Sequence, residues 1–249
     1  MGNTFKKIMK FVMLPFFSDL KTYLRIYFLI LKLLPTMLYN KNISILREEI
    51  GKINFTYKIF GEKITLPGKT FFGFAEEIYI RKCYFPNSNF QIKKGMVVFD
   101  LGANIGIVSI LAAKLGARVF AIEMEKELCE EILKNAKTNK CEDKIKIING
   151  AVGYQKDNKI NTLSLDKILE ENNINNIDFM KIDIEGAEFG LFKETIWLER
   201  TKKIVMEVHP PQVTPEYIKE ILLNNNYQVN YSEVIDPGGS STSYLFANK

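Results

Sequence analysis

The sequence predicts an α/β fold: a doubly wound, mostly parallel sheet of seven strands, with an N-terminal helical and strand-rich extension. From residue 96 onward, short apolar runs alternate regularly with segments of helical periodicity. The first apolar run ends at Asp100 and leads through a small-residue turn into an apolar helix. A strand, tight turn and helix in this order form a binding site for a nucleotide-like ligand, because backbone N–H groups are exposed at the helix start.

The remaining elements follow in chain order. Before the main alternation, residues 54–60 and 63–66 are expected to form two strands around a glycine turn, and residues 74–84 a helix. The strands of the main sheet are expected at 96–100, 118–122, 144–149, 177–183, 203–208, 226–231 and 243–247. The helices between them are expected at 105–115, 125–139, 161–172, 187–198 and 214–225. A short Asp-Pro-Gly-Gly loop at 236–239 predicts that the last two strands form an antiparallel hairpin at one edge.

Composition indicates a globular protein with three parts, at residues 1–50, 51–92 and 93–249. Of the 249 residues, 47% are hydrophobic and 25% charged, which are ordinary globular values. The three cysteines are odd in number and have no C-x-x-C spacing, so we expect a reducing compartment, the cytoplasm. His209 is the only histidine, which argues against a histidine-based metal cluster or a Cys/His zinc site.

The first 50 residues are basic and rich in apolar residues. They carry eight Lys/Arg and three acids, so they account for the whole chain's net charge of +5. No uninterrupted apolar run reaches the roughly 18 residues of a spanning helix. One interpretation is a pair of helices that pack their apolar side on the body of the protein. The other is peripheral contact of residues 5–39 with the inner membrane surface; nucleic acid is not expected, since no binding motif is present.

Polar residues gather at the carboxyl ends of the expected strands, where ligands bind in such sheets. They are acids or small turn-forming residues: Asp100 with the 102–106 turn, Glu123, 149–151, 183–186 and 207–209. Carboxylates can accept hydrogen bonds from ribose hydroxyls, whereas a bare phosphate would favour Lys or Arg. This edge of the sheet therefore suits a nucleoside better than a phosphate.

The turn after Asp100 distinguishes between cofactors. A dinucleotide fingerprint requires G-x-G-x-x-G, but Asn104 stands where the second glycine should be. Asp100 inside the turn could face an ammonium group rather than a pyrophosphate. S-adenosylmethionine carries an ammonium, a sulfonium and a ribose, and no phosphate. We therefore predict S-adenosylmethionine as the cofactor.

A set of motifs in this order resembles the FkbM-type methyltransferases over residues 74–247. The motifs are VFDLGANIG at 98–106, Glu123, NGAVG at 149–153, TLSLD at 162–166, DFMKIDIEGAE at 178–188 and MEVHP at 206–210. Met124 and Asn226 are mild departures from the family pattern. The resemblance implies a Rossmann-like class I methyltransferase fold. It also implies methyl transfer from S-adenosylmethionine, usually to a hydroxyl oxygen of a sugar, glycan or small natural product.

Site residues are predicted from the strand ends together with this resemblance. The expected cofactor-binding residues are Asp100, Gly102, Ala103, Asn104, Gly106, Glu123, Asn149 and Ala151. The expected catalytic residues are Asp183, Glu185 and His209, with Asp183 the first choice of base. Alternatively, the acids at 183–188 pair with Lys181 only to hold the strand end, and His209 is a loop or packing residue. No metal is expected; Asp183 and Glu185 could hold a divalent cation, but the sequence offers no evident third ligand.

Two rival functions remain open. An NAD(P)-dependent oxidoreductase is disfavoured by Asn104 and by the absence of a Tyr-x-x-x-Lys pair. A cofactor-binding scaffold without turnover is compatible with the same fold.

Overall fold

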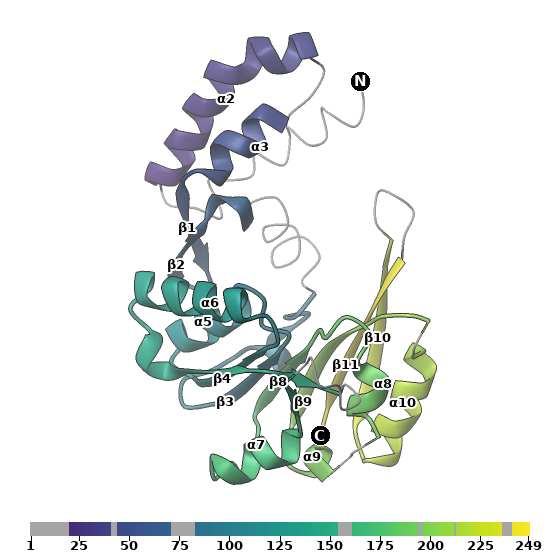
Figure 1. Ribbon diagram of the computed structural model, residues 1–249. Helices are drawn as coiled ribbons and strands as arrows, with labels where there is room; N and C mark the ends of the chain where they lie inside the picture. Colours follow the sequence, from purple (N-terminus) through teal and green to yellow (C-terminus); the bar gives the residue numbers. More distant parts are fainter. Residues whose placement is uncertain are drawn as a thin grey trace. The chain divides into compact units, whose positions relative to one another are not determined.

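A computed structural model describes residues 20–40, 44–70, 83–153, 161–193, 196–211, 213–235 and 241–249 (Figure 1). The chain divides into two compact units, Met1–Ile80 and Arg81–Lys249. The sequence had placed boundaries at 50 and 92, so the strand-rich lead-in falls mainly in the first unit. The expected helix at 74–84 lies outside the described residues, except for Cys83 and Tyr84, which form a bend.

The first unit combines two helices with a β-hairpin. Its elements are α2 (Leu20–Asn40), α3 (Ser44–Gly51), β1 (Asn54–Ile59), β2 (Glu62–Pro67) and the short 3-10 helix η2 (Gly68–Thr70). Alternate residues of the antiparallel hairpin are buried, which is the period-two pattern of a strand with one covered face. Thr22 of α2 accepts a hydrogen bond at its Oγ1 from the Thr56 N–H at 3.1 Å, which ties the helix to the hairpin. The two predicted strands are confirmed.

The second unit confirms the predicted fold class. Its sheet contains β3 (Val97–Leu101), β4 (Arg118–Glu123), β5 (Ile145–Asn149), β8 (Phe179–Ile182), β9 (Lys203–Val208), β10 (Gln228–Ile235) and β11 (Ser241–Asn248). These seven strands lie in the order β10-β11-β9-β8-β3-β4-β5. The five from β9 to β5 are parallel, whereas β11 runs antiparallel to both β9 and β10. The predicted edge hairpin is thus present.

Helices lie on both faces of this sheet (Figure 1). On one side are α5 (Ile107–Lys114) and α6 (Lys126–Thr138), and on the other are α7 (Leu165–Glu171) and α9 (Ile196–Glu199). Against the edge hairpin lies α10 (Pro215–Asn224). Apolar side chains fill the layers between them, as in the stacked rings of Phe99 and Phe120, whose centroids are 4.8 Å apart.

Two expected helices differ from the structure. The segment expected at 187–198 contains two short described helices, α8 (Glu188–Leu191) and α9, rather than one continuous helix. The segment expected at 161–172 begins with β7 (Thr162–Leu163), which pairs with β6 (Ala151–Val152). Two-residue strands are too short to show a hydrophobic period, so the sequence could not indicate this small sheet. The short 3-10 helices are η4 (Ser88–Phe90) and η5 (Glu142–Lys144).

Strand β3 is the point at which the chain reverses its winding direction. It pairs with β4 on one side and with β8 on the other, so the connections from β3 leave in opposite directions. A crevice forms at the carboxyl ends of strands at such a switch point, where no crossover covers the sheet edge.

Candidate active site

A pocket of about 240 Å³ lies at the carboxyl ends of β3, β4 and β8. It is lined by Gly102, Asn104, residues 122–125, Leu128, residues 150–152 and residues 183–185. Four of these described lining residues are acids and none is Lys or Arg. The pocket therefore suits a ligand with hydroxyls and positive charge, and not a pyrophosphate.

The turn after β3 contains residues with left-handed backbone, among them Gly102 and Asn104. Gly102 has φ +71°, and a Cβ built on it would lie 1.8 Å from the carbonyl oxygen of Asp183. Glycine therefore lets the ends of β3 and β8 approach closely. Asn104, which replaces the second glycine of the dinucleotide motif, has φ +52°. Asparagine is one of the few residues that adopt this conformation readily, so the turn closes without that glycine.

Glu123 is the central polar group of the pocket. It is 6% exposed, and its Oε2 and Oε1 accept hydrogen bonds from the N–H groups of Asn104 at 2.7 Å and Glu125 at 3.0 Å. A carboxylate offers about four acceptor positions, so about two remain for a ligand. Asn149 supports this arrangement, because its Nδ2 donates to the carbonyl oxygens of Glu123 at 3.0 Å and Met124 at 2.9 Å.

The structure divides the predicted cofactor residues into two groups. Those that line the pocket are Gly102, Asn104, Glu123 and Ala151; those that do not are Asp100, Ala103, Gly106 and Asn149. Gly106 has φ +84° and is the N-cap of α5, so it shapes the turn. Asp100 differs most from its expected role, which was to face the ammonium group of the cofactor. It is 1% exposed and turned inward, where it accepts a hydrogen bond from Ser109 Oγ at 2.6 Å.

Lys181 on β8 joins the turn to the neighbouring strand end. Its Nζ donates to the Gly102 carbonyl oxygen at 2.7 Å and lies 3.5 Å from Asp100 Oδ1 and 3.3 Å from Asp183 Oδ2. Burial disfavours the charged ammonium, but the nearby Asp183 and Asp100 carboxylates outweigh it and hold the pKa of Lys181 above its ordinary value. The contacts of Lys181 agree with the alternative interpretation, in which its ion pairs hold the end of the strand in place.

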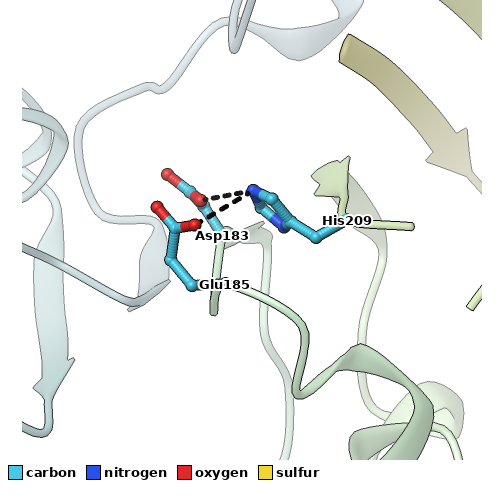
Figure 2. A group of neighbouring side chains, drawn as sticks. All are labelled: Asp183, Glu185 and His209. Carbon is cyan, nitrogen blue, oxygen red and sulfur yellow. Dashed lines mark ion pairs between the residues drawn. The ribbon is translucent and has the colours of Figure 1, made fainter. Parts of the chain in front are cut away.

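A second group of charged residues surrounds His209, just after β9. Its Nε2 lies 3.8 Å from Asp183 Oδ1, 3.6 Å from Glu185 Oε2 and 3.6 Å from Glu207 Oε1. Its Nδ1 is 2.7 Å from Oε1 of the fully buried Glu188. Figure 2 shows the Asp183 and Glu185 carboxylates beside the same edge of the imidazole ring. The three predicted catalytic residues therefore meet, although only Asp183 and Glu185 line the pocket.

The ionisation of these groups affects their use as bases. Burial alone would raise the pKa of Asp183, but the charges of Lys181 and His209 outweigh it and hold the pKa below its ordinary value. Glu188 and Glu207 raise the pKa of His209 to about 10. An imidazolium accepts no proton, and a carboxylate with a lowered pKa accepts one weakly. Both shifts disfavour proton acceptance by these groups at neutral pH, and the role of Asp183 as the base stays a prediction.

Sequence reasoning missed one contact of the site. Tyr84, before the sheet, donates its hydroxyl to Asp183 Oδ2 at 3.1 Å. A tyrosine 99 residues away from its partner gives no periodic or motif signal. Glu188 and Glu207 both stood in the quoted motifs, and Glu207 also stood among the strand-end acids. Nothing in the sequence indicated that both would contact His209.

Comparison with known families finds two matching models. The Methyltransferase FkbM domain model matches residues 153–229, and the Ribosomal protein L11 methyltransferase model matches residues 86–174. The first match contains Asp183, Glu185 and His209, whereas the second contains the turn after β3 and Glu123. Both models describe methyltransferases.

Individual relatives match over shorter stretches. A ribosomal protein L11 methyltransferase of Desulfitobacterium hafniense is 39% identical over 62 residues, which are 25% of this chain and 20% of the relative. A second, from Dictyoglomus thermophilum, is 40% identical over 65 residues, 26% of this chain and 22% of the relative. The matches thus span about a fifth of each relative's length. A solved precorrin 8W decarboxylase of Methanobacterium thermoautotrophicum is 19% identical, with TM-score 0.45, covering 64% of this chain and 83% of the other.

The family models bear directly on the resemblance that the sequence motifs indicated. The FkbM match begins at Gly153 and runs through DFMKIDIEGAE and MEVHP, the motifs that contain the charged residues around His209. Over residues 153–229 the chain is thus confirmed as similar to the FkbM-type, S-adenosylmethionine-dependent methyltransferases.

Proposed function

We propose that the protein is an S-adenosylmethionine-dependent methyltransferase that methylates a hydroxyl oxygen of a sugar, glycan or small natural product. The observation that carries this proposal is the pocket around Glu123, directly beside the residues that surround His209. One side of the site can bind a nucleoside, and the other presents polar groups to an acceptor.

The pocket fits the proposed cofactor. The free acceptor positions of Glu123 suit the two ribose hydroxyls, and apolar atoms of Met124 and Leu128 offer a surface for an adenine ring. The acidic lining favours a cofactor with an ammonium and a sulfonium over NAD(P), whose pyrophosphate it would repel. When bound, S-adenosylmethionine supplies an activated methyl group; the chain's residues orient the acceptor and exclude water.

A hydroxyl acceptor is supported by the part of the chain beyond the cofactor pocket. The ribosomal protein L11 methyltransferase match ends at residue 174, before Asp183, so it concerns the cofactor side. The FkbM match covers the residues around His209. Carboxylates there can hydrogen-bond to a polyol and would repel the phosphates of RNA.

The test is incubation of the protein with S-adenosylmethionine carrying a labelled methyl group and fractionated cell extract, followed by mass spectrometry. We expect label on a glycan or small molecule; label only on protein or RNA would overturn the hydroxyl acceptor. Calorimetry with S-adenosylhomocysteine and with NAD tests the cofactor. Tight binding of NAD with no binding of S-adenosylhomocysteine would overturn the methyltransferase proposal itself.

We also propose that the enzyme works in the cytoplasm, at the inner membrane surface, through α2. Exposed apolar residues recur along one side of this helix at helical spacing: Leu20, Leu24, Tyr27, Phe28 and Leu31. Lys21, Arg25 and Lys32 lie among them, and the helix contains no acid. No described helix is long and apolar enough to cross a bilayer. This pattern supports shallow contact with anionic lipid; residues 5–19 of the expected segment lie outside the described part.

Vesicle flotation tests this contact. We expect the full chain to float with phosphatidylglycerol vesicles and to float less with phosphatidylcholine vesicles. A Leu24→Ser, Phe28→Ser, Leu31→Ser variant should bind at least tenfold more weakly, because three side chains lose their burial in lipid. Leu223→Ser, an exposed leucine of α10, is the matched control. Unchanged flotation of the triple variant contradicts the proposal, and a lowered unfolding temperature would show instead that the stripe packs within the protein.

A further inference from the structure

We propose that Asp183, Glu185 and His209 bind one divalent cation of the Mn²⁺ type beside the proposed cofactor pocket. The sequence alone had offered two carboxylates without a third ligand. The structure supplies it, because β8 and β9 are adjacent parallel strands whose carboxyl ends place His209 opposite the two acids.

The spacing of the ligand atoms fits a single ion. The Nε2 atom of His209 lies 3.8 Å from Asp183 Oδ1 and 3.6 Å from Glu185 Oε2, and one ligand atom from each residue lies within 4.8 Å of the others. Metal–ligand bonds of about 2.0–2.2 Å place neighbouring ligands about 3 Å apart and opposite ligands about 4.3 Å apart. Small side-chain rotations therefore suffice to close the site.

The imidazole is already held in the orientation that a metal ligand needs. Its Nδ1 bonds to Glu188 Oε1 at 2.7 Å, and the Gly186 N–H donates to the same oxygen at 3.3 Å. A carboxylate on the far nitrogen is the usual support of a metal-binding histidine, because it fixes the ring and leaves the other nitrogen for the ion. Glu188 thus positions His209 and leaves Nε2 facing Asp183 and Glu185, where a bound ion would take the place of the Nε2 proton.

The charges around His209 favour the binding of a further cation. Four carboxylates lie around His209, those of Asp183, Glu185, Glu188 and Glu207. Among the described residues, the Lys181 ammonium also contacts Asp183. Glu188 is fully buried, and its Oε2 has no hydrogen-bond partner among the described residues. Four carboxylates beside one imidazole and one ammonium leave a net negative charge, which a divalent ion would reduce. A ligand set of two carboxylates and one imidazole suits Mn²⁺. Ca²⁺ prefers ligands that are all oxygen, and softer metals prefer sulfur.

The role of the ion rests on the proposed function. Asp183 and Glu185 also line the pocket, so the ion would hold an acceptor oxygen next to the transferable methyl group. A bound cation lowers the pKa of a coordinated hydroxyl, so the acceptor would lose its proton more readily. As the oxygen–methyl bond forms, the sulfur–methyl bond breaks to leave a neutral thioether, and the hydroxyl proton passes to water.

The experiment is titration of the full chain with Mn²⁺ and no methyl donor, followed by electron paramagnetic resonance of free Mn²⁺ and by calorimetry. We expect one ion per chain. Glu185→Gln should weaken binding at least tenfold, and because this side chain is 83% exposed the variant should fold normally. Glu220→Gln, an exposed acid on α10, is the matched control and should bind as the parent does. Absence of stoichiometric binding, or equal binding by Glu185→Gln and the parent, would overturn the site.

Failure of the metal site can be distinguished from failure of the proposed function. Binding of S-adenosylhomocysteine in the presence of a chelator reports on the cofactor pocket alone. Cofactor binding without Mn²⁺ binding would overturn the metal site and leave the methyltransferase proposal intact. Mn²⁺ binding without cofactor binding would confirm the ion and overturn the methyltransferase proposal.

Discussion

Glu123→Ala is expected to weaken the binding of S-adenosylhomocysteine about a hundredfold. The carboxylate is the group in the pocket that can accept from both ribose hydroxyls, since its backbone partners leave about two acceptor positions free. Hydrogen bonds to a charged group contribute about 1.5 kcal/mol or more each, so losing two costs about 3 kcal/mol, or about two decades in Kd. Isothermal calorimetry on the full chain measures this change.

The control for this variant is Glu127→Gln, an exposed acid in the first turn of α6 that does not line the pocket. Its affinity should match that of the parent. Because Glu123 also accepts from the backbone of the turn, thermal unfolding of Glu123→Ala must be recorded. A folded Glu123→Ala protein with unchanged affinity would show that the nucleoside does not bind at this carboxylate.

Gly102→Ala should be the most destabilising alanine substitution in the turn after β3. The new Cβ would lie 1.8 Å from the Asp183 carbonyl oxygen, a backbone atom that cannot move without separating β3 from β8. The position also has φ +71°, which costs a side chain about 1–2 kcal/mol. We expect a total loss above about 4 kcal/mol in the free energy of unfolding, measured by urea denaturation.

The variant Gly95→Ala separates the steric clash from the cost of the left-handed backbone. Gly95 has φ +85°, but a Cβ there has no atom within 4 Å, so this variant should lose only the 1–2 kcal/mol of the left-handed backbone. Similar losses for both variants would mean that the approach of β3 to β8 is not the constraint at Gly102. The difference between the two losses in free energy of unfolding measures the cost of the steric clash at Gly102.

Much of the catalytic fold could be predicted because its elements leave local signals. Strand β9 was predicted at its observed limits, and β3, β4 and β5 to within a residue at each end, because buried parallel strands are continuous apolar runs. The edge hairpin followed from a short Pro-Gly loop. Elements without a period were missed, such as the two-residue strands β6 and β7.

Part of the site was predictable for the same reason. Once a strand is predicted, the residues at its carboxyl end are known. Glu123, Asp183 and Glu185 were therefore placed at the correct edge of the sheet, and each lines the pocket. Asp100 also ends a strand, but it turned inward to Ser109 and Lys181. The direction of a side chain at a strand end depends on partners from other strands, which local sequence does not reveal.

The sequence by itself determined the order of strands and helices along the chain and the acidic character of one sheet edge, because both depend on near neighbours. Only the tertiary structure decided that β9 pairs with β8 on the side away from β3. That order brings His209 to Asp183 and Glu185, residues 26 and 24 positions away, and places Glu188 behind the imidazole. Contacts of this kind arise from the pairing of distant strands, and hydrophobic periodicity carries no information about which strands will pair.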